Sequence, residues 1–101
     1  MSILPDPAQI EERVREILTD ALSLRPDQVR PESRLIEDLG AESIDLLDLR
    51  FRIEKTFGFR ISTQDLAEAF GTGIAPEEFR RRFTVAALCD YVRMRLEQAR
   101  G

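Results

Sequence analysis

Residues 36–62 of the chain read IEDLGAESIDLLDLRFRIEKTFGFRIS, and this stretch decides the fold. Its apolar residues recur at the three- and four-residue spacing of an α-helix, from Glu42 or Ser43 to about Phe57. Gly58 then stands where a helix commonly ends, because glycine adopts the left-handed backbone conformation at no steric cost. The stretch therefore predicts one well-bounded helix in the middle of the chain.

The first 41 residues predict another helix and then a long loop. Asp6 is placed to cap a helix over about residues 7–23, with Pro7 at its first position and Gln9 ready to complete a capping box. Residues 24–41 contain prolines and a glycine, and loops of this length usually have a functional reason. The residues expected to hold this loop on the bundle are Val29, Leu35, Ile36 and Leu39.

Three more helical segments are predicted after residue 60. One begins at Ser62 or Thr63 and ends near Phe70, and Pro76 opens a short second one. Thr84 caps a last helix, whose inner stripe consists of Val85, Leu88, Cys89, Val92 and Leu96. We therefore expect an all-α fold: a four-helix bundle with a long loop between its first two helices and an extra short helical segment before the last.

Composition narrows the classes of protein. A length of 101 residues fits a single domain over residues 1–101, and a net charge of −4 argues against nucleic acid as a partner. The apolar runs are too short for stable membrane insertion. The lone Cys89 and an N-terminus without secretory features indicate the cytoplasm, and nothing indicates more than a monomer. The absence of histidine excludes the Ser-His-Asp and Cys-His catalytic sites and all metal sites with histidine ligands. We therefore expect neither an enzyme nor a metal protein.

The negative charge is concentrated in residues 37–48. This segment holds no Lys or Arg, and its acidic residues are Glu37, Asp38, Glu42, Asp45 and Asp48. One interpretation is an ordinary solvated loop and helix start. The other is a docking surface for basic partners, and charge alone does not decide between them.

The central helix carries two apolar stripes when its residues are placed at about 100° per residue. One stripe consists of Leu46, Leu49, Ile53 and Phe57. The other consists of Ile44, Leu47 and Phe51. Because a surface helix needs one stripe to join a core, the second stripe either packs on a further part of the bundle or is exposed for docking. Both hold in part if Leu47 is buried while Ile44 and Phe51 are exposed.

Ser43 stands at the start of this helix, directly after Gly40, Ala41 and Glu42. The simplest interpretation is a helix N-cap, which is where most such serines are found. An exposed hydroxyl at a helix N-terminus is also a favourable place for a phosphate ester. The local sequence leaves both open.

These residues resemble the acyl carrier protein family, whose signature is Asp-Leu-Gly-Ala/Met-Asp-Ser-Leu before an acidic and apolar helix. The matching residues are Asp38, Leu39, Gly40, Ala41 and Ser43. Glu42 and Ile44 replace the usual Asp and Leu and keep charge or apolarity. The resemblance extends to residues 10–18 and 29–40, and it resumes at residues 84–92.

The resemblance implies that Ser43 carries a covalent 4'-phosphopantetheine arm, attached by a separate phosphopantetheinyl transferase. The arm's thiol then holds an acyl chain as a thioester and delivers it to acyl-chain synthases and acyltransferases of fatty-acid or lipid biosynthesis. The resemblance also implies which residues bind partners: Glu42, Ile44, Asp45, Leu47, Asp48, Phe51 and Glu54.

Two features depart from the family's pattern. Arg50, Arg52 and Lys55 stand among the acids of the central helix, where Lys55 is expected near Asp48 and Arg52 near Asp45. They either pair internally or narrow the set of partners.

Residues 71–83 have no clear counterpart in short family members and include Ile74, Phe79, Phe83 and three consecutive arginines. They are either a tolerated surface insertion or a segment that caps or widens the acyl cleft or recognises a dedicated partner. The second interpretation predicts a specialised carrier, for instance of long or modified chains such as those destined for lipid A. Two other interpretations of the function remain: a carrier of polyketide or aminoacyl intermediates, and an unmodified helical interaction module.

Overall fold

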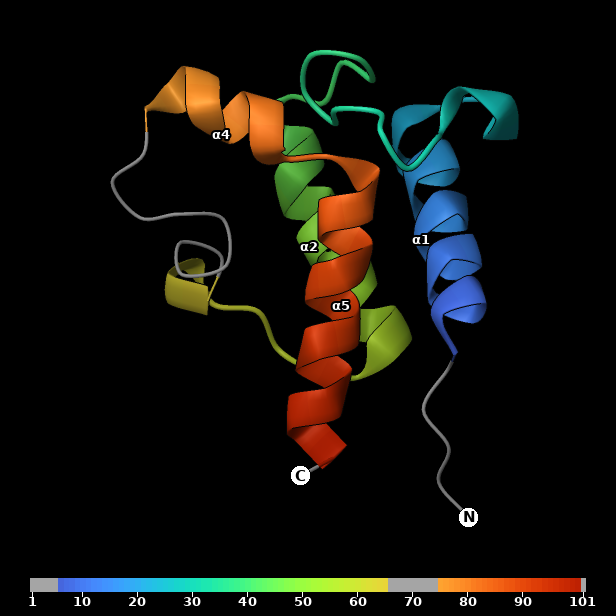
Figure 1. The fold of residues 1–101 in the computed structure, drawn as a ribbon, viewed down its shortest axis with the longest axis vertical. Coiled ribbons are helices and arrows are strands. Elements are labelled where there is room, and N and C mark those ends of the chain that lie inside the picture. Colours follow the sequence, from blue (N-terminus) through green and yellow to red (C-terminus); the bar gives the residue numbers. More distant parts are fainter. Residues whose placement is uncertain (1–5, 66–74, 101) are drawn as a thin grey trace.

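The computed structural model describes residues 6–65 and 75–100, and within them the fold is a bundle of α-helices. Helix α1 (Pro7–Leu22) packs against both α2 (Ser43–Phe57) and α5 (Val85–Arg100). Helix α4 (Pro76–Arg82) crosses the end of the bundle at which α2 and α5 begin (Figure 1). The predicted all-α bundle with an extra short helix before the last is confirmed.

Helix α1 begins as its sequence predicts. The Asp6 carboxylate accepts a hydrogen bond from the Gln9 amide at 2.9 Å, and the Gln9 side chain accepts one from the Asp6 amide at 3.0 Å. Pro7 occupies the first turn, where its missing N–H costs nothing. The buried face of α1 consists of Ile10, Val14, Ile17 and Leu18.

The long loop between α1 and α2 contains one short 3₁₀ turn, η1 (Pro26–Gln28). Val29 and Leu35 are buried, and Ile36 and Leu39 pack partly buried against the core, as expected. The sequence did not predict that the loop also pairs with the chain just before α5. The Leu35 amide donates to the Phe83 carbonyl at 2.9 Å and the Val85 amide donates to the Ser33 carbonyl at 2.9 Å. These bonds fix the loop to the α4–α5 connection.

Helix α2 runs from Ser43 to Phe57 and ends at Gly58, which has a left-handed φ of 80°. Leu49 and Ile53 of its first predicted stripe are buried, while Leu46 and Phe57 pack partly buried against the same core. The predicted bounds and the inward stripe are confirmed.

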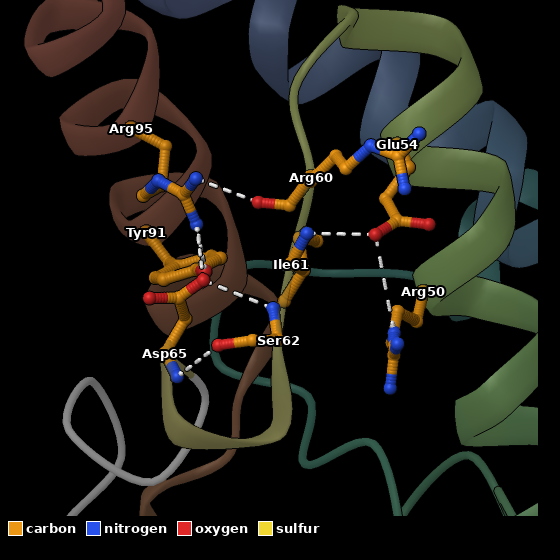
Figure 2. A network of polar contacts seen from close by, with 8 residues as sticks. All are labelled: Arg50, Glu54, Arg60, Ile61, Ser62, Asp65, Tyr91 and Arg95. Carbon is orange, nitrogen blue, oxygen red and sulfur yellow. Dashed lines mark hydrogen bonds and ion pairs between the residues drawn. The ribbon is translucent and has the colours of Figure 1, made fainter.

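The segment after α2 is held between α2 and α5 by polar contacts (Figure 2). Arg95 of α5 donates to the Arg60 carbonyl at 2.6 Å, to the Tyr91 hydroxyl at 2.8 Å and to the Asp65 carboxylate at 3.4 Å. Ser62 caps the next helix, since its hydroxyl accepts from the Asp65 amide at 3.0 Å. The Ser62 amide in turn donates to the Asp65 carboxylate at 2.9 Å, and this hydrogen bond is the main reason that the pKa of Asp65 is lowered. The predicted helix here starts as expected, and its later part lies outside the described residues.

The last helix, α5, is capped by Thr84, whose hydroxyl accepts from the Ala87 amide at 3.1 Å. Its predicted inner stripe is confirmed, with Cys89 half-buried and the other members buried. Tyr91, which the stripe omitted, is buried as well. In the part of the chain that is described, no helix is long and apolar enough to cross a membrane.

Candidate functional site

Ser43 is the first residue of α2, and its side chain is exposed. The N-cap position belongs to Glu42, whose backbone amide donates to the Asp45 carboxylate at 2.9 Å. The interpretation of Ser43 as the N-cap is therefore wrong for this helix. The side chain is exposed at the first turn, where the partial positive charge of the helix end favours an attached phosphate.

The turn before Ser43 is held by hydrogen bonds between backbone groups. Gly40 has a φ of 74° and donates from its amide to the Ile36 carbonyl at 3.1 Å. The left-handed conformation favours glycine here, because a Cβ atom would strain it. The Ala41 amide closes the turn on the Leu35 carbonyl at 2.9 Å, and Ala41 itself is buried. The turn thus fixes where α2 begins and where Ser43 projects.

The acidic residues around this site are largely engaged within the chain. Arg34 pairs with Glu37 at 3.0 Å and with Asp38 at 3.2 Å, and its hydrogen bond lowers the pKa of the Asp38 carboxyl. Asp48 pairs with Arg52 at 2.9 Å. The net acidic field predicted for residues 37–48 is therefore weaker at the surface than the count of carboxylates indicates.

Arg52 corrects the expected charge pairing on α2. It was expected near Asp45, but it bridges Asp48 on its own helix and Asp20 on α1, each at 2.9 Å. Residues four apart face each other on a helix, and Arg52 and Asp48 have that spacing. The Asp45 carboxylate instead accepts a hydrogen bond from the Glu42 amide. Among the described residues, Lys55 makes no ion pair, so its expected pairing with Asp48 is not seen.

Glu54 points toward the segment that follows α2 (Figure 2). Its carboxylate accepts a hydrogen bond from the Ile61 amide at 2.7 Å and lies 4.0 Å from Nε of Arg50. The long Glu54 side chain thereby satisfies a backbone donor of the segment after α2. This hydrogen bond gives Glu54 a role within the chain, where its half-buried carboxylate holds the segment after α2.

The second apolar stripe of α2 is exposed along its length. The exposed fractions of Ile44, Leu47 and Phe51 are 72%, 53% and 61%. The interpretation that this stripe packs inside the bundle is wrong, and so is the expectation that Leu47 alone is buried. We refer to these three residues as the exposed apolar surface. Surface of this kind next to a polar rim marks a place where proteins bind.

A cavity of about 90 Å³ lies on the other side of α2, between α2, α4 and α5. Its walls are almost entirely apolar side chains, and the residues that line it are Leu46, Leu49, Arg50, Ile53, Ile61, Phe79, Phe83, Leu88 and Tyr91. Leu46 follows Ser43 by three residues and therefore lies on the same side of the helix one turn later. The cavity is thus close to the end of α2 that carries Ser43.

Phe79 and Phe83 come to this cavity from α4 and its end, and their rings stack with centroids 5.2 Å apart. The sequence singled out both as apolar members of residues 71–83 but did not place them. Arg50 also lines the cavity, which its sequence position does not predict, because a charged residue on a helix normally faces water.

A second cavity, of about 150 Å³, lies between α1 and α5 and contains Cys89. None of its lining residues comes from α2, so it is separate from Ser43. Burial raises the pKa of the Cys89 thiol to about 11, which keeps it protonated and unreactive at neutral pH. This cavity offers no nucleophile.

Comparison with known proteins identifies the family. The family described as phosphopantetheine attachment site matches residues 12–72, which include Ser43 and the whole of α2. The acyl carrier protein of Nitratidesulfovibrio vulgaris (strain DP4) is 41% identical over 56 residues, 55% of this chain and 74% of that protein. The acyl carrier protein of Syntrophus aciditrophicus (strain SB) is 44% identical over 57 residues, 56% of this chain and 71% of that protein.

The family match ends before α4 and α5, so the proposal that residues 71–83 are an insertion stays a prediction. The family match over more than half of the chain, and relatives covered over more than two thirds of their length, agree with each other. The chain belongs to the acyl carrier protein family, whose members hold a phosphopantetheine group and serve as carriers, not enzymes.

Proposed function

We propose that Ser43 is the residue to which 4'-phosphopantetheine is attached. The observation that carries this proposal is the position of Ser43: it is exposed at the first turn of α2, one residue after the N-cap Glu42, whose amide donates to the Asp45 carboxylate. A transferase can approach such a hydroxyl without disturbing the helix. The phosphate of the arm would then lie at the helix N-terminus, where backbone amides face it.

The arm would carry an acyl chain as a thioester on its terminal thiol. Its flexibility raises the effective concentration of that thioester in the active site of a docked enzyme. The partners proposed are a phosphopantetheinyl transferase and the acyl-chain synthases and acyltransferases of fatty-acid or lipid biosynthesis. We propose that the carrier acts as a monomer in the cytoplasm.

The exposed apolar surface is the main contact proposed for these partners. Ile44, Leu47 and Phe51 project from α2 just beyond Ser43 and have no role in the core. Glu42, Asp45 and Asp48 belong to the same end of α2 and would add weak, screened attraction for basic groups. Glu54 is also proposed as a partner contact, and its hydrogen bond with the Ile61 amide positions the segment after α2.

The apolar cavity is proposed to shelter the acyl chain. At about 90 Å³ it has the room of roughly three liquid waters, so it accepts only a few chain atoms in this conformation. A longer chain requires α4 to move, because Phe79 and Phe83 form its wall there. This arrangement supports a specialised carrier in which Phe79 and Phe83 act on the cargo, for instance a long or modified fatty acid, a lipid A precursor, a polyketide or an aminoacyl group.

An intact-mass measurement tests the proposal. Purified protein is incubated with coenzyme A and a transferase of broad specificity, in parallel with Ser43→Ala and Thr56→Ala. Thr56 also has an exposed hydroxyl on α2 and is the matched control. The wild type and Thr56→Ala are expected to gain one phosphopantetheine, and Ser43→Ala none. A gain in Ser43→Ala would refute the assignment, and circular dichroism shows that the variants are folded.

A further inference from the structure

Arg50 presents a buried hydrogen-bond donor that is not used. In the described part of the chain its Nε is shielded from solvent and donates no hydrogen bond. The Glu54 carboxylate oxygen is 4.0 Å away, which is an ion-pair distance but too long for a hydrogen bond. Buried donors nearly always make a hydrogen bond, so an exception at a cavity indicates that a ligand supplies the acceptor.

The position of Arg50 relative to Ser43 indicates which ligand could reach its Nε. Arg50 lines the apolar cavity and follows Ser43 by seven residues, which is about 10.5 Å along the helix axis on the same side of α2. Figure 2 shows its side chain directed into the space between α2 and the segment of Ile61 and Ser62. An acyl chain held on the arm of Ser43 would pass this group on entering the cavity.

The charges around Arg50 favour a neutral acceptor over an anion. Glu54 lies beside the guanidinium and offsets its charge, while its own carboxylate is anchored by the Ile61 amide. A carboxylate cargo would meet Glu54 as well as Arg50 and would be repelled by it. A hydroxyl or keto oxygen accepts from Nε without that repulsion.

We propose that Arg50 is a specificity-determining residue for the cargo, and that its Nε–H donates a hydrogen bond to a neutral oxygen on the acyl chain. The carrier then retains chains with a hydroxyl or keto group near the thioester better than plain hydrocarbon chains of equal length. This inference rests on the proposed attachment at Ser43. It adds a chemical class of cargo that the attachment itself does not specify.

The direct test follows the Arg50 Nε–H signal by NMR in ¹⁵N-labelled protein. The signal is assigned by its loss in Arg50→Lys. The protein is loaded with the bare arm, with a hexanoyl arm or with a 3-hydroxyhexanoyl arm, each in a hydrolysis-resistant form, and loading is verified by mass. Proton exchange at Nε is expected to be roughly three- to tenfold slower with the hydroxylated chain than with the plain chain, as one net hydrogen bond implies.

The controls separate the possible sources of the acceptor oxygen. Equal exchange rates with the hexanoyl and 3-hydroxyhexanoyl arms would overturn the proposal. Full protection by the bare arm would also overturn it, because the oxygen would then belong to the arm and would select no cargo. Failure to load any arm contradicts the proposed function instead, so the two failures are distinguishable.

Thermal unfolding of loaded variants gives a second readout. In the wild type the 3-hydroxyhexanoyl form is expected to have a higher Tm than the hexanoyl form. This difference should vanish in Arg50→Leu and persist in Arg52→Leu, which removes an arginine of the same helix outside the cavity. A difference that persists in Arg50→Leu contradicts the proposal, and the NMR test on the wild type decides if Arg50→Leu does not fold.

Discussion

Leu47 and Leu49 are two residues apart on the same helix, yet they belong to opposite sides of the molecule. Leu49 is 3% exposed and lines the apolar cavity, whereas Leu47 is 53% exposed and belongs to the exposed apolar surface. A leucine thus packs in the core at position 49, whereas a leucine at position 47 is available to partners. Helix α2 therefore has more apolar residues than the core buries, and the exposed ones lie next to Ser43.

The largest effect should come from the matched pair Leu49→Ala and Leu47→Ala. Truncating the buried leucine leaves a cavity and should lower the free energy of unfolding by about 2–5 kcal/mol. Truncating the exposed one should change it by only about 0.5 kcal/mol. Urea unfolding measures both. Similar losses for the two variants would show that the exposed apolar surface is part of the core after all.

A smaller loss is expected when the contact between α2 and Ile61 is removed. Glu54→Ala leaves the Ile61 amide without its acceptor and should cost about 1–3 kcal/mol. Glu54→Gln keeps an acceptor oxygen and should cost less. Hydrogen exchange of the Ile61 amide should quicken in the alanine variant, and unchanged exchange there would remove the internal role given to Glu54.

On the exposed apolar surface, Phe51→Ala should reduce partner binding without reducing stability. Phe51 is 61% exposed, and exposed aromatic residues commonly dominate binding energy at interfaces. The kcat/KM of the phosphopantetheinyl transferase for this carrier should fall about tenfold. Thr56→Ala, also on α2, should leave it unchanged. A normal rate with Phe51→Ala would mean that this transferase docks elsewhere.

The smallest effect concerns the turn before Ser43. Arg34 lowers the pKa of Asp38 in the folded state, so this pair stabilises the fold above the unfolded pKa of about 4 and the contribution is lost as the pH falls through the lower folded value. Because Asp38 is exposed, the change is modest. Urea midpoints between pH 6 and pH 3 should fall more for the wild type than for Asp38→Asn. Parallel curves would show that the pair contributes nothing.

Much of the fold could be predicted because helix ends are local features. The capping box of Asp6 and Gln9, the left-handed Gly58 and the cap at Thr84 all lie where the sequence predicts them. Periodicity also predicted which stripe of α2 faces inward. These signals depend on neighbours within a few residues, so one sequence contains them in full.

The site was less predictable because its contacts join distant segments. Backbone bonds such as that from Leu35 to Phe83 leave no pattern in the sequence. A helical wheel gives the direction of a Cβ atom but not the path of a long side chain, which is why the expected neighbour of Arg52 was wrong. Ser43 could not be told from an N-cap until the structure placed Glu42 there.

The most direct test of attachment at Ser43 is peptide mapping of the loaded protein. Trypsin cleaves after Arg34 and Arg50, and the fragment LIEDLGAESIDLLDLR between them contains Ser43 as its one hydroxyl-bearing residue. We expect phosphopantetheine on this fragment and on no other. The modification on any other fragment, or none on this fragment after treatment with several transferases, would contradict the assignment.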